Sequence, residues 1–197
     1  MKERSSINSI LAVIGLIVFV MGFAPKSYAI AILIDFDTLP GGGALPNNSV
    51  LTNQYSAVGA IFSGFENGGS VLQPTATTQF SGEFGGLPVS GQILENRDTS
   101  NNRADVVEIS FLSSVFGIEF DFVPFGSQGP NTQFIAFDSL SNQIFNQAVG
   151  GPASTNVNFH YTGLSALSGV ARLEIHQPRD NWVWGLDNLQ YQQYNYL

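Results

Sequence analysis

Asn181-Trp182-Val183-Trp184-Gly185-Leu186-Asp187-Asn188-Leu189-Gln190-Tyr191 is the last apolar stretch of this 197-residue chain, and a polar tail follows it. Aromatic and apolar residues surround the single carboxylate of Asp187, as in a buried closing β-strand. A closing strand must pair with one that is already formed. The opening stretch of residues 32–37, Ile-Leu-Ile-Asp-Phe-Asp, is also β-rich and also acidic. The sequence therefore predicts that the two ends of the folded chain pair with each other.

The first 29 residues have the three parts of a secretory signal peptide. Lys2 and Arg4 give a basic start, residues 10–23 form an apolar run, and Ser27 and Ala29 are the small residues before a cut after Ala29. An uncleaved anchor is the alternative, but the run of 14 residues is shorter than the about 20 that cross a bilayer. We therefore expect a signal-peptide helix at 1–29, a single mature domain at 30–197, and a secreted or periplasmic protein with no membrane span after cleavage.

The mature chain is strongly acidic. It keeps four basic and 14 acidic residues, for a net charge of −10, and contains no lysine. Such a surface repels phosphate backbones and anionic membranes, which excludes nucleic acid as a partner and favours a multivalent cation as counter-ion. The absence of cysteine excludes disulfides, thiol nucleophiles and zinc–thiolate sites.

Apolar and polar residues alternate regularly from residue 105 onward, as in strands with one buried face. Turn residues separate these runs, and alternating strand–helix units are missing. The pattern predicts an all-β fold, an antiparallel β-sandwich or jelly roll of about eight to ten strands. One short helix is expected within residues 50–59, because Leu51, Tyr55 and Val58 are spaced by four and three, and Gly59 provides a cap.

Acids occur on both of the end strands. Asp35 and Asp37 share one strand parity, and Asp187 shares the parity of Leu189 and Tyr191. If the latter two face the core, Asp187 is a poorly solvated carboxylate that needs a partner. Calcium binds six to eight oxygens, several of them from carboxylates, so the sequence predicts a structural calcium site. The alternative is that Asp187 accepts backbone hydrogen bonds and the other two acids are solvated.

Trp182 and Trp184 have the strand parity opposite to that of Asp187. If Leu189 and Tyr191 face the core, both indoles face outward. Exposed aromatic rings form stacking platforms for the apolar faces of sugars, so these two tryptophans are the predicted ligand-binding residues. The alternative is that one or both belong to the core, as large aromatic residues usually do.

Catalytic signatures are missing or incomplete. Glu119 and Asp121 share one strand face, and retaining glycoside hydrolysis needs two carboxyl groups about 5 Å apart. However, Val123-Pro124 follows where the second glutamate of the sandwich-fold glucanase motif Glu-x-Asp-x-x-Glu would come. Neither His160 nor His176 has a nucleophile at a motif-like spacing. We therefore expect no catalytic residues, and solvated strand faces explain these side chains.

Three segments carry a resemblance to known proteins. They are residues 35–42 (Asp-Phe-Asp-Thr-Leu-Pro-Gly-Gly), residues 51–55 (Leu-Thr-Asn-Gln-Tyr) leading to Gly59 and Phe62, and residues 185–189 (Gly-Leu-Asp-Asn-Leu). Together they resemble a group of exported bacterial β-sandwich proteins, many of which carry a C-terminal PEP-CTERM sorting signal. This chain ends Tyr194-Asn195-Tyr196-Leu197, without the Pro-Glu-Pro motif, apolar helix or basic end of that signal, so free secretion is expected instead.

The closing Leu-Asp-Asn-Leu is also similar to the last strand of jelly-roll carbohydrate-binding modules. In those modules the equivalent aspartate commonly ligates a structural calcium ion together with acids near the first strand. The resemblance implies that Asp187, with Asp35 or Asp37, ligates calcium, and that the commonest activity of the wider fold is sugar binding.

Three functional hypotheses follow. The first is a secreted, non-catalytic binding module for a glycan or cell-surface polymer, stabilised by calcium. The second is a structural or matrix protein without a small ligand. The third is a glycan-active hydrolase of sandwich fold.

Overall fold

The computed structural model describes residues 27–66, 70–78, 85–86, 91–98, 100, 102–124, 132–149, 157–177 and 183–196. Residues 27–30 and 194–196 belong to one compact unit, and Ala31–Gln193 form another, which contains Asp35, Asp37 and Asp187. The first 26 residues lie outside the described residues. The signal peptide and the domain boundary at residue 30 therefore stay predictions.

The described chain consists of strands and one 3-10 turn, η1. Antiparallel pairs connect the central strands, and β5 pairs with β10 in parallel. This confirms the all-β prediction, with 12 strands where about eight to ten were expected. The elements are β1 (Ser27–Ile34), β2 (Ser49–Val50), η1 (Ser56–Val58), β3 (Ala60–Phe65), β4 (Thr75–Thr77), β5 (Gly85–Gly86), β6 (Ile93–Glu95), β7 (Val106–Pro124), β8 (Thr132–Phe137), β9 (Gln143–Val149), β10 (Val157–Leu164), β11 (Val170–His176) and β12 (Trp184–Tyr196).

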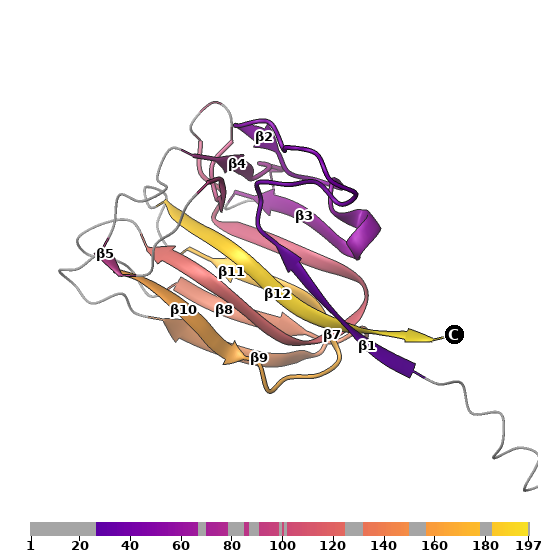
Figure 1. Ribbon diagram of the computed structural model, residues 1–197. Helices are drawn as coiled ribbons and strands as arrows, with labels where there is room; N and C mark the ends of the chain where they lie inside the picture. The colour runs from indigo at the N-terminus through magenta and orange to yellow at the C-terminus, as the bar shows by residue number, and fades with distance from the viewer. Residues whose placement is uncertain are drawn as a thin grey trace, which may run out of the picture. The chain divides into compact units, whose positions relative to one another are not determined.

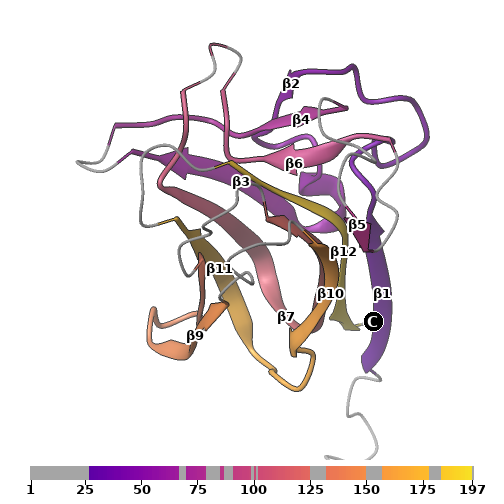
Figure 2. The same ribbon diagram turned by 90° about the vertical axis from the view of Figure 1, so that its left-hand side faces the viewer.

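The long strand β7 belongs to both layers of the unit Ala31–Gln193. Residues 106–111 pair with β3 and β11, and residues 115–124 pair with β10 and β12. The strand curves strongly along its length (Figure 1), and Gly117 in its second part has a φ of 64° that favours glycine. Figure 2 shows β3 and β11 beside the start of the strand.

We call the two layers by their central strands. The β11 layer contains β3, the first part of β7, β11, β8 and β9, and the β12 layer contains β10, the second part of β7, β12, β6, β4 and β2. Aromatic side chains pack between them. The ring of Phe134 from β8 lies 5.2 Å from Phe120, 5.1 Å from Phe122 and 4.6 Å from Tyr161, centroid to centroid. Such edge-to-face and tilted contacts are favourable beyond the area they bury.

The predicted pairing of the chain ends is confirmed, because β1 pairs with β12. Strand β1 ends at Ile34, and Phe36 two residues later has a left-handed φ of 56°. The Phe36 ring is fully buried and contacts Tyr55 and Phe62 at 5.9 and 5.8 Å. Packing of this ring holds the chain between Asp35 and Asp37 against the core.

The short helix expected within residues 50–59 is smaller than predicted. Only the single 3-10 turn η1 forms, and Gly59 caps it with a φ of 91°. The apolar spacing did locate a buried face, since Leu51 and Tyr55 are both in the core. One turn covers that short face before β3 begins at Ala60. None of the helices in the described ranges has the length and apolar character needed to cross a membrane.

Candidate functional site

Asp187 lies in β12 just before a bulge, which changes the direction of its side chain. The register with β7 shifts between Asp187 and Gln190, and Asn188 has a left-handed φ of 50°. One extra residue resets the alternation of side chains. Leu189 therefore faces the core, while Asp187 lies on the other face beside its cross-strand partner Asp121. The prediction that Asp187 points with Leu189 was wrong, because it assumed an unbroken strand.

The carboxyl group of Asp187 is nevertheless poorly solvated, as predicted. The residue is 3% exposed, and its Oδ1 accepts a hydrogen bond of 2.7 Å from the backbone N–H of Asn188. The pKa of Asp187 is raised to about 7, chiefly by burial; the hydrogen bond from Asn188 opposes this rise, and the negative charges of Asp121, Asp37 and Asp35 add to it. Desolvation and like charges both disfavour the ionised form, so this is an uncompensated acid.

Asp35 and Asp37 are tied to their surroundings in different ways. Asp35 Oδ1 accepts hydrogen bonds from the backbone N–H of Asp37 and of Thr38, at 3.1 and 3.0 Å, and so closes its own turn. Asp37 Oδ1 accepts one of 2.7 Å from the backbone N–H of Gln92, next to β6. Gly91 makes this approach possible, because a Cβ there would collide with the Asp37 carboxylate.

The three acids predicted to ligate calcium are thus close enough for their charges to act on Asp187. Within the described ranges, however, no three side chains of His, Cys, Asp or Glu lie close enough together to hold a metal ion. Calcium also accepts carbonyl, amide and hydroxyl oxygens. The residues present therefore fit calcium only as part of a donor set that includes such oxygens.

Trp184 does not form the predicted stacking platform. The residue is 1% exposed, its ring lies 5.8 Å from that of Phe122, and its backbone N–H donates to Asn96 Oδ1 at 3.1 Å. The prediction for Trp184 was wrong for the same reason as that for Asp187: the bulge lets Trp184 and Leu189 both face the core. Trp182 lies outside the described residues.

An acidic row crosses the outer face of the β12 layer, consisting of Glu119, Asp121, His160 and Asp187. The imidazole of His160 lies between two carboxylates, with Nδ1 2.8 Å from Asp121 Oδ1 and Nε2 3.3 Å from Glu119 Oε2. The hydrogen bond to Asp121 and that to Glu119 raise the pKa of His160, against desolvation. Each ring nitrogen of His160 therefore faces one carboxylate.

A second group, which we call the charged face, lies on the β11 layer and consists of Glu108, Arg172, Glu174, His176 and Phe137. Glu108 and Glu174 are cross-strand partners, and Arg172 Nε lies 3.1 Å from Glu174 Oε1 and 3.9 Å from Glu108 Oε2 as ion pairs. His176 Nε2 lies 2.7 Å from Glu174 Oε2. The Arg172 guanidinium carbon lies 4.2 Å from the ring centroid of Phe137, a cation–π contact.

The sequence showed these residues only as polar positions of separate strands. The register between neighbouring strands brings these residues together. The alternation of apolar and polar residues along one strand does not reveal how that strand aligns with its neighbour. One feature of the sequence did bear on these groups. Basic residues are scarce in this chain, so few carboxylates can have a basic partner.

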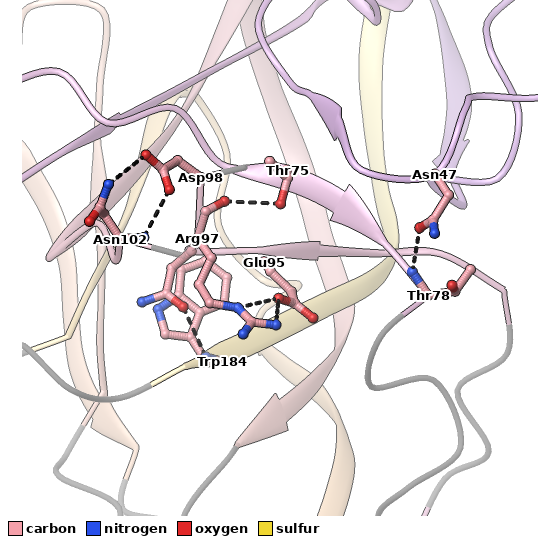
Figure 3. Close-up of polar contacts among 9 residues, drawn as sticks. Asn47, Thr75, Thr78, Glu95, Arg97, Asp98, Asn102 and Trp184 are labelled. Atoms are coloured by element: carbon pink, nitrogen blue, oxygen red, sulfur yellow. Dashed lines mark hydrogen bonds and ion pairs between the residues drawn. The ribbon is translucent and has the colours of Figure 1, made fainter. Parts of the chain in front are cut away.

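A third polar group is internal and structural (Figure 3). Arg97 donates two hydrogen bonds to Glu95 Oε2, from Nε at 2.8 Å and from Nη2 at 2.7 Å, and both residues are buried. Burial raises the pKa of Glu95 to about 7, and Arg97 opposes that rise. Thr75 Oγ1 donates a hydrogen bond of 2.9 Å to the backbone carbonyl of Arg97, and this bond links the Glu95–Arg97 pair to β4.

None of these groups has the arrangement of a hydrolase. Retaining and inverting mechanisms need one carboxylic acid and one free carboxylate on either side of the bond that breaks. Both oxygens of Glu174 contact bases, Glu119 and Asp121 contact His160, and Asp187 is covered. Polar contacts to a ligand are the chemistry that the charged face can supply.

Similarity to known proteins is found at the level of structure. No family model matches the chain, and no curated protein matches it. A solved structure of a mutant family 29 carbohydrate-binding module, from work on ligand recognition by that family, is similar at 14% identity and a TM-score of 0.44, over 84% of this chain and 92% of that one. A similarity of that size does not extend to a shared ligand.

Proposed function

We propose that the protein is an exported, non-catalytic binding module for a glycan or cell-surface polymer, stabilised by a structural calcium ion. The observation that carries the binding function is the charged face, which combines hydrogen-bonding side chains with an aromatic ring on a β-sheet. Export rests on the three-part pattern of residues 1–29. It is tested by sequencing the N-terminus of the protein from the culture medium, where a start at Ile30 is expected.

The charged face supports sugar binding through Arg172 in particular. Its Nε forms an ion pair with Glu174 Oε1 at 3.1 Å, its guanidinium carbon lies 4.2 Å from the centroid of the Phe137 ring, and its side chain is 31% exposed. An arginine fixed in this way presents a rigid fork of donors at little further cost in side-chain entropy. Glu108 accepts a hydrogen bond of 2.6 Å from Ser110 at Oε1. Its Oε2 lies 3.9 Å from Arg172 Nε, so a sugar hydroxyl that donates to this oxygen would bind beside the guanidinium group.

Binding is tested by calorimetry and by pull-down on a panel of insoluble and soluble polysaccharides. Arg172→Ala is expected to abolish binding and Arg172→Lys to weaken it, because lysine keeps the charge and loses the fork. Glu119→Gln, on the other layer, is the matched control and should bind as the wild type does. Loss of binding in Glu119→Gln with retention in Arg172→Ala would place the ligand on the acidic row instead.

The same panel separates the two other hypotheses. Release of reducing sugar that Glu119→Gln abolishes would establish a hydrolase. Absence of binding to every polymer would leave a structural or matrix protein as the better account.

Calcium is proposed at the chain ends because Asp187 is a buried acid with three further acids nearby, and no base in the described ranges forms an ion pair with it. A bound cation removes the cause of its raised pKa. Asp187 and Asp37 would supply carboxylate oxygens, and calcium would neutralise them and hold β12 to the segment that follows β1. Calorimetric titration of the metal-free protein with calcium tests this, and Asp187→Asn is expected to abolish the heat of binding.

A further inference from the structure

Strand β9 is an exposed, open edge of the β11 layer. It pairs with β8 on one side, and no strand in the described ranges pairs with its other side (Figure 2). All residues of Gln143–Val149 are exposed except Phe145 and Val149, which are half-buried. The free side of such a strand carries backbone N–H and C=O groups that another strand can bind.

The other edges of the unit Ala31–Gln193 are shorter or covered. The segment before β3 covers that strand, since the Phe62 N–H donates to the Thr52 carbonyl at 2.7 Å. Strand β10 lies between β5 and β7, and β2 has two residues. Strand β1 pairs with β12 alone, but only residues 31–34 of it belong to this unit. In the described part of the unit, β9 is therefore the longest open edge.

Strand β9 also lacks most of the features that keep sheet edges apart. Proteins protect open edges with charged side chains, prolines and bulges. Residues 139–159 contain no Asp, Glu, Lys or Arg, and the strand itself contains no proline. A bulge lies at its start, where the register with β8 shifts, but residues 145–149 pair regularly with residues 132–136. Most of the strand is thus regular enough to accept a further strand.

The absence of charge indicates which partner fits this edge. The mature chain is strongly acidic, so two copies repel each other wherever their acids approach. That repulsion is weakest at the β8–β9 hairpin, where Leu140 and Ile144 are 81% and 37% exposed. A basic partner would gain most from the acidic parts of the surface instead. An uncharged edge on an acidic protein therefore fits a second copy of the same chain.

We propose that β9 pairs antiparallel with β9 of a second copy across a two-fold axis, which joins the two β11 layers into one continuous sheet. An axis at the middle of the strand places Asn146 opposite its own symmetry mate and Ile144 opposite Ala148. Every such pair is uncharged, and the two Asn146 amides lie within reach of a hydrogen bond. The contact is self-complementary, as a closed two-fold interface requires.

This pairing has a consequence for polymer binding. The two-fold axis is perpendicular to the joined sheet, so both charged faces lie on the same side of it. Five strand spacings separate β11 from its symmetry mate, or about 24 Å. A polymer that spans this distance contacts both charged faces and gains avidity. The pairing itself does not depend on the proposed binding function, and only this use of it does.

The test measures self-association of residues 30–197 by sedimentation equilibrium. The wild type should form a dimer. Asn146→Lys and Asn146→Asp each place two like charges opposite each other, and each should raise the dimer dissociation constant at least about tenfold. An equimolar mixture of the two variants should restore the dimer, because opposite charges then meet. Asn146 is exposed on the strand edge, so neither variant disturbs the core.

Two control variants separate pairing through β9 from other contacts. Leu140→Lys removes an exposed apolar side chain from the turn beside β9, and Leu33→Lys places a charge on β1, where Leu33 is 58% exposed. Both should keep the wild-type dissociation constant. Hydrogen exchange gives a second readout: backbone amides on the free side of β9 should become protected in the wild-type dimer and exchange freely in Asn146→Lys.

A wild type that stays monomeric at millimolar concentration would overturn the proposal. A dimer that both Asn146 variants retain, or that only Leu33→Lys or Leu140→Lys dissociates, would also overturn it by placing the interface elsewhere. A mixture of the Asn146 variants that stays monomeric would contradict the two-fold pairing of this residue. A wild-type dimer that binds no polysaccharide would keep the pairing and refute only its use for polymer binding.

Discussion

Glu174 and Asp187 lie on the outer faces of the two layers, and their surroundings are opposite. Glu174 has Arg172 at one oxygen and His176 at the other. Asp187 has acids around it and, among the described residues, no base, and its pKa is raised to about 7. The difference separates two uses of a carboxylate. Where bases surround it, a carboxylate belongs to a rigid polar face, and we propose that this face binds the ligand. Where acids surround it, a carboxylate is uncompensated, and we propose that a cation binds there.

The pH dependence of the metal-free protein is the largest expected effect. An acid whose folded pKa lies above its unfolded value of 3.8 contributes stability that is full below that value and is lost as the pH rises through about 7. Asp187 alone accounts for about 4 kcal/mol, at about 1.4 kcal/mol per pKa unit. Urea unfolding in EDTA from acid to mildly alkaline pH measures this loss.

Two variants apportion that loss. The pKa of Glu95 is also raised to about 7, so both acids contribute to the loss of stability with rising pH. Asp187→Asn should remove the larger part of this pH dependence, whereas Glu95→Gln should leave the part that is due to Asp187. A flat profile in the wild type would show that Asp187 is not an uncompensated acid.

The buried Glu95–Arg97 pair shows how much a base beside a buried carboxylate contributes to the free energy of unfolding. Arg97→Met leaves Glu95 without its partner, and we expect a loss of about 3 kcal/mol in the free energy of unfolding. The double variant with Glu95→Gln should recover much of it, because the uncompensated charge is then absent. Chemical denaturation at neutral pH checks both, and equal stability of the single and double variants would argue against compensation.

Removal of the base from the charged face should have a smaller effect, because that face is partly solvated. Arg172→Ala is expected to lower the free energy of unfolding by about 1 kcal/mol. High salt should reduce the difference, since salt screens exposed pairs. A loss as large as that for Arg97→Met would mean that the charged face is part of the core.

The smallest effect is expected at the acidic row. His160→Gln removes contacts to Asp121 and Glu119 on an exposed strand face, and exposed pairs contribute about 1 kcal/mol or less. The pKa of His160 is raised, so its contribution is full below pH 6.5 and disappears as the pH rises through the folded pKa. Wild type and variant should therefore converge in alkaline solution, and a constant difference would contradict this.

The fold was largely readable from the sequence, and the sites only in part. Alternation in two runs, residues 107–111 and 116–122, predicted the faces of most of β7, and the apolar ends predicted the β1–β12 pairing. The polar pair Ser113-Ser114 between the two runs indicated a turn, whereas β7 is one continuous strand. The bulge at Asn188 was not read from the sequence. Asparagine adopts the left-handed conformation more readily than most residues, but it does so in turns as well, so its presence alone does not mark a bulge. That one residue reversed the predicted facing of Asp187 relative to Leu189 and placed Trp184 in the core.

The register between neighbouring strands is the second kind of information that the sequence did not reveal. Glu108 and Glu174 are 66 positions apart in the sequence, and only the β7–β11 register makes them partners. The burial of Asp187 was nevertheless predicted, although for the wrong reason: Asp187 was expected among core residues, whereas it lies on the opposite face of β12, beside Asp121 and Asn188.

Thermal unfolding of residues 30–197 in EDTA and then in excess calcium tests the central contrast most directly. Binding to the native state alone stabilises it by about 2.7 kcal/mol at a hundredfold excess over Kd, which is roughly 5–10 °C for a domain of this size. We expect that rise in Tm in the wild type and in Arg172→Ala, and its absence in Asp187→Asn. Equal Tm values with and without calcium in the wild type would contradict the account and leave Asp187 as a protonated structural acid.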